Sequence, residues 1–340
     1  MQLQPPRRAT LADVAAKAGV TKSVASRVIN NRDTINVRPQ TRQRIIDAAR
    51  ELEYQPHAMA RALAESRTRV VTMLMPDLSN PAYDRILQGA LEAANHAQHI
   101  LMLLEADESG VYPGFESLLR DGLSAGVLVG AFGEDVGPAL ERYRVPHVFV
   151  NRAVEGSSRN VVIDMESASA TAVEHLAGLG HTRLAQVDGP TTISSSRSRI
   201  QGFQACAARL GLPAPRLAHG DFTEQGGAEA MRELLAGPRR PTGVFVGTLR
   251  QAMGVLSVLH EAGLAVPQNV SVICADDAPP AAFTIPPLTT LQPPFRELGR
   301  AAIDALMAQI EGAAPRSATL PFPATLIDRG STARADQDGR

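Results

Sequence analysis

The chain has few of the residues that build stapled or membrane-spanning proteins. Only two cysteines occur among 340 residues, Cys206 and Cys274, and they lie far apart in apolar surroundings. Their placement argues against a disulfide framework or a zinc site and favours a reducing cytoplasm. No run of about 18 apolar residues exists, which argues against a membrane span. Residues 1–10 lack the apolar segment of a signal peptide, so we expect no secretion leader.

Catalytic signatures are equally scarce. Residues 194–196 are all serine, but no Gly-x-Ser-x-Gly elbow surrounds them. The eight histidines lack the spacing of metal ligands, and no glycine-rich phosphate loop carries a lysine. We therefore expect a protein that is not an enzyme and that uses no metal and no cofactor.

Charge is divided unevenly along a chain whose length suits two or three domains. Residues 1–69 contain 13 Lys and Arg against 6 Asp and Glu, a net charge of +7. The remainder contains 21 basic and 29 acidic residues, a net charge of −8. This asymmetry indicates a polyanion as partner for the N-terminal part only, with chance clustering of surface arginines as the alternative.

Residues 10–52 have the spacing of three short helices. Thr10 followed by Asp13 is a helix-start signal, Gly19 permits a sharp turn, and Thr21 is suited to cap a second helix. A third helix begins near Pro39. The polar side chains expected to face outward from the second helix are Lys22, Ser23, Ser26 and Arg27. This pattern suits a helix that enters the DNA major groove, although an ordinary helical hairpin is the alternative.

From residue 70 the chain alternates short apolar runs with helical patterns. The runs are Val70–Met75, Ile100–Leu104, Val127–Ala131, Val145–Val150, Leu184–Val187, Val244–Val246 and Val270–Cys274. The helical patterns lie near 81–97, 167–179, 198–210, 225–236 and 250–263. The spacing predicts an α/β fold with parallel sheets covered by helices on both faces, and the number of units predicts two lobes.

Several motifs occur in one order along the chain. They are the helix-turn-helix pattern at 10–30, Tyr54-Gln-Pro56, Gly180-His-Thr-Arg183, Pro267-Gln-Asn-Val-Ser271 and Pro286-Pro-Leu-Thr-Thr290. Together they resemble the lactose-repressor (LacI/GalR) family as far as about residue 332. The resemblance implies a helix-turn-helix headpiece followed by a two-lobed, periplasmic-binding-protein-like (type I) sensor.

The resemblance also implies boundaries for these parts. The headpiece would span 1–56, the hinge helix and linker 57–69, and the effector-binding and dimerisation domain 70–332. Lobe 1 would comprise about 70–163 and 292–320, and lobe 2 about 164–291 and 321–332. The polar tail, 333–340, is predicted to be disordered.

DNA contacts follow from the same resemblance. Lys22 and Ser23 fall on positions that read base edges, and Arg27 on one that reads guanine, whose O6 and N7 match a guanidinium. Thr21 and Ser26 are predicted phosphate contacts, and Thr10 is counted in the DNA-binding set.

The predicted hinge needs DNA to fold, because so short a helix is unstable in water. In the family, paired hinge helices lie in the minor groove. Leu63 falls on the residue that wedges into a base step, and Ala60 on the close-packed position. The alternative is that Leu63 only begins the packing of the linker.

The resemblance places an effector between the lobes. Arg199 and Asp276 fall on the family's effector-binding arginine and aspartate, which suit neighbouring sugar hydroxyls, although a helix-surface charge and a polar turn are the alternatives. The other matching positions are Asn80, Tyr83, Asn151, Ser195, Phe222, Thr248 and Phe295. The chain has Thr248-Leu249 where the family commonly has Asn-Asp, which predicts a less hydroxylated or differently charged effector, or a loss of strong binding.

We therefore expect a cytoplasmic transcriptional repressor with no membrane contact. A homodimer would bind a palindromic operator in double-stranded DNA, since the tail lacks the apolar heptads that build tetramers. A small-molecule effector, expected to be a carbohydrate, would control binding as an inducer or a co-repressor. A solute-binding protein of a transporter, a sugar-metabolising enzyme and a constitutive DNA binder remain alternatives.

Overall fold

The computed structural model describes residues 9–29, 37–54, 68–107, 110–130, 136–322 and 325–335. The chain divides into two compact units, residues 1–68 and 69–340. The first unit carries short helices, and the second carries two β-sheets with their covering helices.

The helices of the first unit are α1 (Leu11–Lys17), α2 (Lys22–Ile29) and α3 (Pro39–Glu51), which confirms the three predicted helices. Thr10 Oγ1 accepts a hydrogen bond from the Asp13 N–H at 3.3 Å, and the Asp13 carboxylate accepts one from the Thr10 N–H at 2.8 Å. This reciprocal pair is a capping box, so the predicted helix start is also confirmed. Gly19 turns the chain with a φ of 63°.

Small apolar side chains fill the interior of the first unit. The buried ones are Val14, Ala15, Ala18, Ala25, Val28, Ile45 and Ala48. So few small groups remove little apolar surface from water, and a domain of this size is only marginally stable.

Two six-stranded sheets form the second unit, in the orders β11-β5-β4-β3-β1-β2 and β12-β10-β9-β8-β6-β7. The first comprises β1 (Val70–Met75), β2 (Ile100–Glu105), β3 (Gly126–Val129), β4 (His147–Val150), β5 (Asn160–Ile163) and β11 (Ala318–Leu320). The second comprises β6 (Leu184–Asp188), β7 (Arg216–His219), β8 (Gly243–Val246), β9 (Ser271–Cys274), β10 (Thr289–Leu291) and β12 (Leu326–Ile327). Their strands pair in parallel except β12, which runs antiparallel to β10 at one edge.

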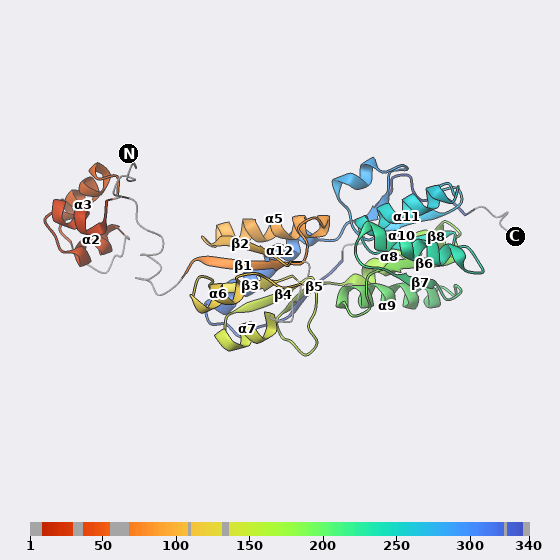
Figure 1. Ribbon diagram of the computed structural model, residues 1–340, viewed down its shortest axis with the longest axis horizontal. Helices are drawn as coiled ribbons and strands as arrows, with labels where there is room; N and C mark the ends of the chain where they lie inside the picture. The colour runs from red at the N-terminus through yellow and green to blue at the C-terminus, as the bar shows by residue number, and fades with distance from the viewer. Residues whose placement is uncertain are drawn as a thin grey trace, which may run out of the picture. The chain divides into compact units, whose positions relative to one another are not determined.

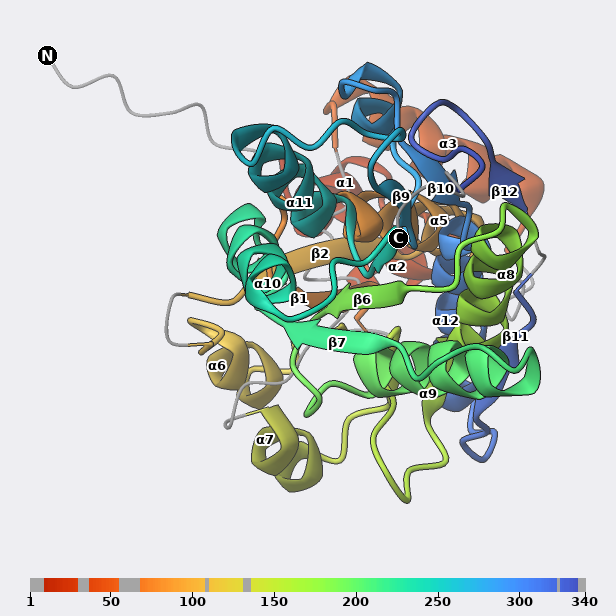
Figure 2. The ribbon, with the colours of Figure 1, turned by 90° about the vertical axis from the view of Figure 1, so that its right-hand side faces the viewer.

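Helices cover both faces of each sheet (Figure 1). Around the first sheet, α5 (Pro81–His96) and α12 (Phe295–Ile310) pack together on one face, and α6 (Phe115–Arg120) and α7 (Val136–Tyr143) lie on the other. Around the second, α8 (Met165–Gly178) pairs with α9 (Ser194–Arg209), and α10 (Glu224–Ala236) pairs with α11 (Leu249–Glu261) on the opposite face (Figure 2). A short 3₁₀ helix, η1, spans Pro279–Phe283.

The predicted fold class is therefore confirmed, with additions. Strands β5, β7, β10, β11 and β12 and helices α6, α7 and α12 did not emerge from the apolar pattern. The strands are short, and β7 reads Arg-Leu-Ala-His, too polar to signal a buried strand. One strand departs from the predicted parallel arrangement, since β12 runs antiparallel to β10.

The chain passes between the sheets three times, after β5, after β10 and after β11. Its end is attached to the second sheet's side of the molecule. The Ala335 N–H donates to the Leu179 carbonyl at 2.8 Å, and Ala333 O lies 3.0 Å from His181 Nε2. Both alanines fall in the segment whose polar composition predicts disorder; residues 336–340 lie outside the described ranges.

Glycines allow the paired helices to approach closely. A Cβ on Gly254 of α11 would lie 1.9 Å from the Glu224 carbonyl oxygen of α10. A Cβ on Gly299 of α12 would lie 2.0 Å from the Ile86 carbonyl oxygen of α5. These helix pairs therefore pack backbone against backbone. Among the described helices, none is long and apolar enough to cross a membrane.

Candidate functional site

A cavity lies between the two sheets of the second unit, with about 410 Å³ of empty space that includes open solvent. It is lined by Asn80, Ala82, Tyr83, Asn151, Arg152, Met165, Ser195, Arg199, Phe222, Thr248, Asp276 and Phe295. Many of these residues follow the last residues of β1, β4, β7, β8 and β9. The cavity therefore lies at the carboxyl ends of parallel strands, where open α/β sheets bind ligands.

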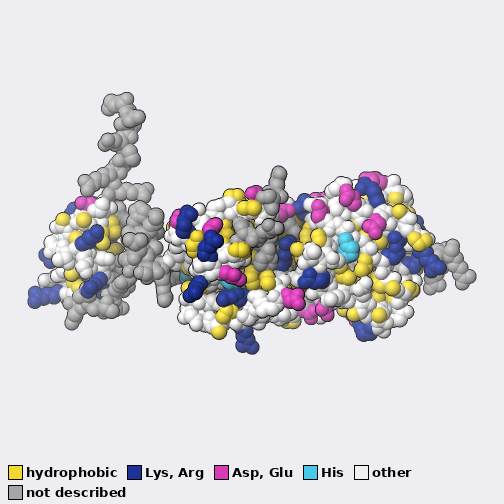
Figure 3. All heavy atoms as spheres, turned by 60° about the horizontal axis from the view of Figure 1, so that its bottom comes forward, with side chains coloured by type: hydrophobic (Ala, Val, Ile, Leu, Met, Phe, Trp, Pro, Cys, Tyr) yellow, Lys and Arg dark blue, Asp and Glu magenta, His cyan; other side chains and the backbone are white. Residues whose placement is uncertain are grey.

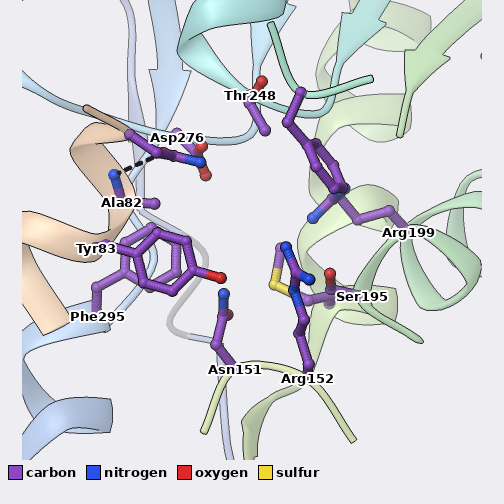
Figure 4. Close-up of a pocket in the computed structure, with 12 residues that line it drawn as sticks. Ala82, Tyr83, Asn151, Arg152, Ser195, Arg199, Thr248, Asp276 and Phe295 are labelled. Atoms are coloured by element: carbon purple, nitrogen blue, oxygen red, sulfur yellow. Dashed lines mark hydrogen bonds between the residues drawn. The ribbon is translucent and has the colours of Figure 1, made fainter. Parts of the chain in front are cut away.

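Every residue predicted to hold the effector lines this cavity. Figure 4 shows their side chains converging from both lobes. Three further lining residues, Ala82, Arg152 and Met165, were missed by sequence reasoning. Arg152 is the next residue after the predicted Asn151 at the end of β4. This position in the sequence could have identified Arg152 as a cavity residue. The roles of all these residues in binding remain predictions.

A buried ion pair fixes Arg199, which is only 5% exposed and is therefore not a helix-surface charge. Its Nε and Nη2 donate to the two carboxylate oxygens of Asp188 at 2.8 and 2.6 Å. Gln186 Nε2 and the Gly189 N–H also donate to that carboxylate, at 2.8 and 2.7 Å. Burial alone would lower the pKa of Arg199, but pairing with Asp188 raises it overall. The guanidinium thus stays charged and points in one direction.

Asp276, two residues after the end of β9, is a buried carboxyl whose charge, unlike that of Arg199, is not fixed near neutral pH. Burial raises its pKa to about 7, with further upward contributions from Asp188 and Asp277, while Arg199 and the Leu249 N–H oppose the shift. Near neutral pH, Asp276 therefore exists in both forms, one that only accepts hydrogen bonds and one that also donates.

The neighbouring Asp277 has a structural role. Its Oδ1 accepts hydrogen bonds from Thr290 Oγ1 at 2.8 Å and from Arg329 Nη2 at 2.7 Å. These bonds attach the loop after β9 to β10 and to the C-terminal segment. The polar-turn alternative thus describes Asp277, whereas Asp276 faces the cavity.

Some cavity side chains already use hydrogen-bonding capacity within the protein. Asn80 Oδ1 accepts from the Ala82 N–H at 3.1 Å, the dashed line in Figure 4. The Tyr83 hydroxyl donates to the Gly130 carbonyl at 3.1 Å. Thr248 Oγ1 caps α11 by accepting from the Gln251 N–H at 3.3 Å, and it donates to the Gln251 side chain at 3.2 Å. Thr248 therefore has fewer hydrogen-bonding groups available to a ligand than an amide side chain at this position would have.

Arg152 lies on the wall formed by the first sheet. Its guanidinium carbon is 5.9 Å from the centroid of the Phe222 ring, within cation–π range. In Figure 4 the side chain extends into the cavity beside Asn151 and Ser195. Arg152 and Phe222 come from opposite lobes, so this contact spans the cleft.

A second contact between the lobes lies outside the cavity. Arg250, at the start of α11, donates to Asp77 Oδ2 at 2.6 Å and to Glu224 Oε2 at 2.7 Å. Its hydrogen bond lowers the pKa of Glu224. Asp77 follows β1 in the first sheet, so Arg250 joins both lobes.

The first unit presents its polar residues on the outside. Lys22, Ser23 and Arg27 of α2 are exposed as predicted, whereas Ser26 is half-buried. Thr21 is exposed and its hydroxyl accepts the Val24 N–H at 3.4 Å, as the predicted cap requires. Figure 3 shows Lys and Arg spread over this unit's surface with little acidic colour.

Two predicted DNA-binding residues, Ala60 and Leu63, lie outside the described residues, as does most of the predicted hinge. Within the described ranges, no cluster of His, Cys, Asp and Glu could hold a metal ion.

Comparison with known proteins gives matches along nearly the whole chain. Residues 10–57 match the bacterial regulatory proteins of the lacI family, and residues 173–332 match a periplasmic binding protein-like domain. The ribose operon repressor of Escherichia coli (strain K12) is 35% identical over 332 residues, covering 95% of this chain and 99% of that protein. The HTH-type transcriptional repressor CytR of the same strain is 34% identical over 330 residues, covering 95% and 96%.

A solved structure agrees. The crystal structure of the Lac repressor dimer bound to operator and the anti-inducer ONPF has a TM-score of 0.82 and 26% identity, covering 96% of this chain and 100% of that one. The helix-turn-helix unit, the two-sheet unit and the full-length similarity to two repressors lead to one assignment. The chain belongs to the lacI family of bacterial regulatory proteins.

Proposed function

We propose that this protein is a cytoplasmic transcriptional repressor whose affinity for DNA is set by a small molecule bound between its lobes. The observation that carries the proposal is the pairing, in one chain, of exposed cations on α2 with a polar cavity between two lobes. The ribose operon repressor matches this chain over 99% of its own length, so both parts have counterparts there.

On the DNA side, α2 would enter the major groove. Exposed Arg27 would donate two hydrogen bonds to a guanine, and Lys22 and Ser23 would contact neighbouring base edges. Thr10, Thr21 and Ser26 would approach phosphates. Two copies would bind the half-sites of a palindromic operator as a homodimer. Residues 57–69, with Ala60 and Leu63, would form the hinge in the minor groove.

On the effector side, the ligand would contact both walls of the cleft. Arg199, fixed by Asp188, would donate to it, and Asp276 would accept or donate according to pH. A ligand held by both walls would change the free energy of cleft closure. Closure would in turn change the position of the first lobe, which follows the hinge in the chain. Coupling of this kind is commonly about 1–3 kcal/mol, roughly a 5- to 150-fold change in DNA affinity.

The DNA-reading role is tested by selecting duplexes from a random pool and measuring their affinity by fluorescence anisotropy. Arg27→Ala should weaken binding to the selected duplex by about 1–3 kcal/mol and relax the sequence preference at one base pair. Arg50→Ala, which removes an exposed cation from α3, is the control and should lower affinity slightly for all sequences. An equal loss on selected and random DNA for Arg27→Ala would remove it from the base-reading set.

Effector control is tested by titrating small molecules against the protein–DNA complex. A compound that binds the cavity should shift DNA affinity, and Arg199→Leu should abolish the shift. DNA affinity unchanged by every compound that binds would instead identify a constitutive DNA binder. Turnover of a bound compound would contradict our proposal that the protein is not an enzyme.

A further inference from the structure

We propose that the cavity selects an anionic, hydroxylated small molecule, whose carboxylate or phosphate is bound by Arg152 and whose hydroxyls are bound by Arg199 and Asp276. This inference rests on the proposed function, because it names the chemical class of the effector.

The two arginines of the cavity differ in how their charge is neutralised. Arg199 forms a bidentate pair with buried Asp188, so its charge is already balanced. Arg152 forms no ion pair with any acidic side chain that the structure describes; its close contact is the face of Phe222 at 5.9 Å. The cavity therefore contains one balanced cation and one cation available to a ligand.

Arg152 is well placed for an anion. The Phe222 ring contacts the guanidinium by a cation–π interaction and leaves the edge with its N–H groups available. That planar set of donors matches carboxylate or phosphate oxygens two at a time. Figure 4 shows the guanidinium inside the cavity rather than extended into solvent.

The opposite end of the cavity suits hydroxyls. Figure 4 shows Asp276 across the cavity from Arg152, so an anion at Arg152 would lie away from the aspartate.

A neutral sugar of the same size would be a poorer fit. It would cover the Arg152 guanidinium and remove water from it without supplying a counter-charge, which opposes binding. The substitution of Thr248-Leu249 for the family's common Asn-Asp acts in the same direction. Only Thr248 of the two lines the cavity, and its hydroxyl is engaged with Gln251, so a sugar hydroxyl finds fewer hydrogen-bonding groups here than an amide would supply.

Calorimetry with matched compounds tests the proposal. The probes are ribose, ribonate and ribose 5-phosphate, and glucose, gluconate, glucuronate and glucose 6-phosphate. We expect the tightest binder to be an anion, at least about 10-fold tighter than the neutral sugar of the same skeleton. Whether it is an acid or a phosphate identifies the source of the charge. Arg152→Gln should weaken binding of that anion by roughly 10- to 100-fold and leave the affinity for the neutral sugar unchanged.

Arg197→Gln is the matched control, because Arg197 is an exposed arginine of α9 outside the cavity lining. Both variants should unfold at the wild-type temperature. The inference is overturned if a neutral sugar binds tightest, if no anionic probe binds, or if Arg152→Gln does not weaken the anion. A neutral sugar that releases DNA would overturn this inference while supporting the proposed function, so the two failures are distinguishable.

Discussion

The two units of the chain use buried groups in opposite ways. The described interior of the first unit consists of valine, alanine and isoleucine, and its polar residues lie outside. The second unit buries aromatic and long apolar side chains, together with a charged pair beneath its cavity. Residues that contact DNA need only to be exposed on a stable helix. A binding site for a small molecule also needs buried charged side chains that are fixed by partners within the core.

The largest effect should come from the charged pair. Asp188→Ala leaves Arg199 buried without its partner, and we expect a loss of about 3–5 kcal/mol in unfolding free energy of the second unit. Denaturant unfolding measures it. Glu174→Gln, which breaks the exposed pair with Arg209, is the control and should change stability by less than about 1 kcal/mol. Equal effects would mean that the buried pair does not support the cavity.

The next prediction concerns pH. The pKa of Asp276 is raised from an ordinary value of 3.8 to about 7 in the folded protein. The free energy of unfolding should therefore fall as pH rises between those values, because the folded state then has to release a proton that it binds more tightly. Asp276→Asn removes this titration. Between pH 5 and pH 8 the free energy of unfolding of the variant should therefore rise relative to that of the wild type, by an amount on the order of 2–4 kcal/mol. Asp304→Asn, at an exposed site, should follow the wild type. Parallel curves for Asp276→Asn and the wild type would contradict the assignment.

Helix packing gives a third prediction, also for the second unit. Gly254→Ala places a Cβ 1.9 Å from the Glu224 carbonyl oxygen and should destabilise the α10–α11 pair by about 1–3 kcal/mol or more. Gly178→Ala, in a helical glycine with open space around it, should be neutral or stabilising by up to about 1 kcal/mol. Thermal unfolding of both variants distinguishes packing from helix propensity.

The smallest expected change lies in the first unit. Thr10→Ala removes the capping box of α1 and should cost about 1 kcal/mol, whereas Thr10→Ser retains the cap. Because the core there is small, this loss should accelerate amide hydrogen exchange throughout α1, α2 and α3 while exchange in the two sheets stays the same. Unchanged exchange in all three helices would show that the first unit has more stability than its core suggests.

The same contrast explains how much the sequence could predict. The helices of the first unit depend on local signals, such as Thr10 with Asp13, and these were recognised directly. The apolar strands β1 to β4, β6, β8 and β9 and the helices α5 and α8 to α11 of the second unit were also predicted, because their periodicity lies within each segment. The short polar strand β7 carries no such pattern.

For the cavity, the family resemblance selected residues that the structure brings together, Arg199 and Asp276 among them. It did not select Arg152, Asp188 or Arg250. The contacts of these residues depend on segments far apart in the chain: Arg152 meets Phe222, and Arg250 meets Asp77. Sequence periodicity has no information about such pairings.

The bridge from Arg250 to Asp77 and Glu224 has a consequence for the chemistry of the surrounding solution. Asp77 and Glu224 are both partly exposed, so dissolved ions screen their attraction to Arg250. Raising ionic strength should therefore favour separation of the lobes even without a ligand. Salt concentration would then act on the same separation of the lobes that a ligand bound between them would change.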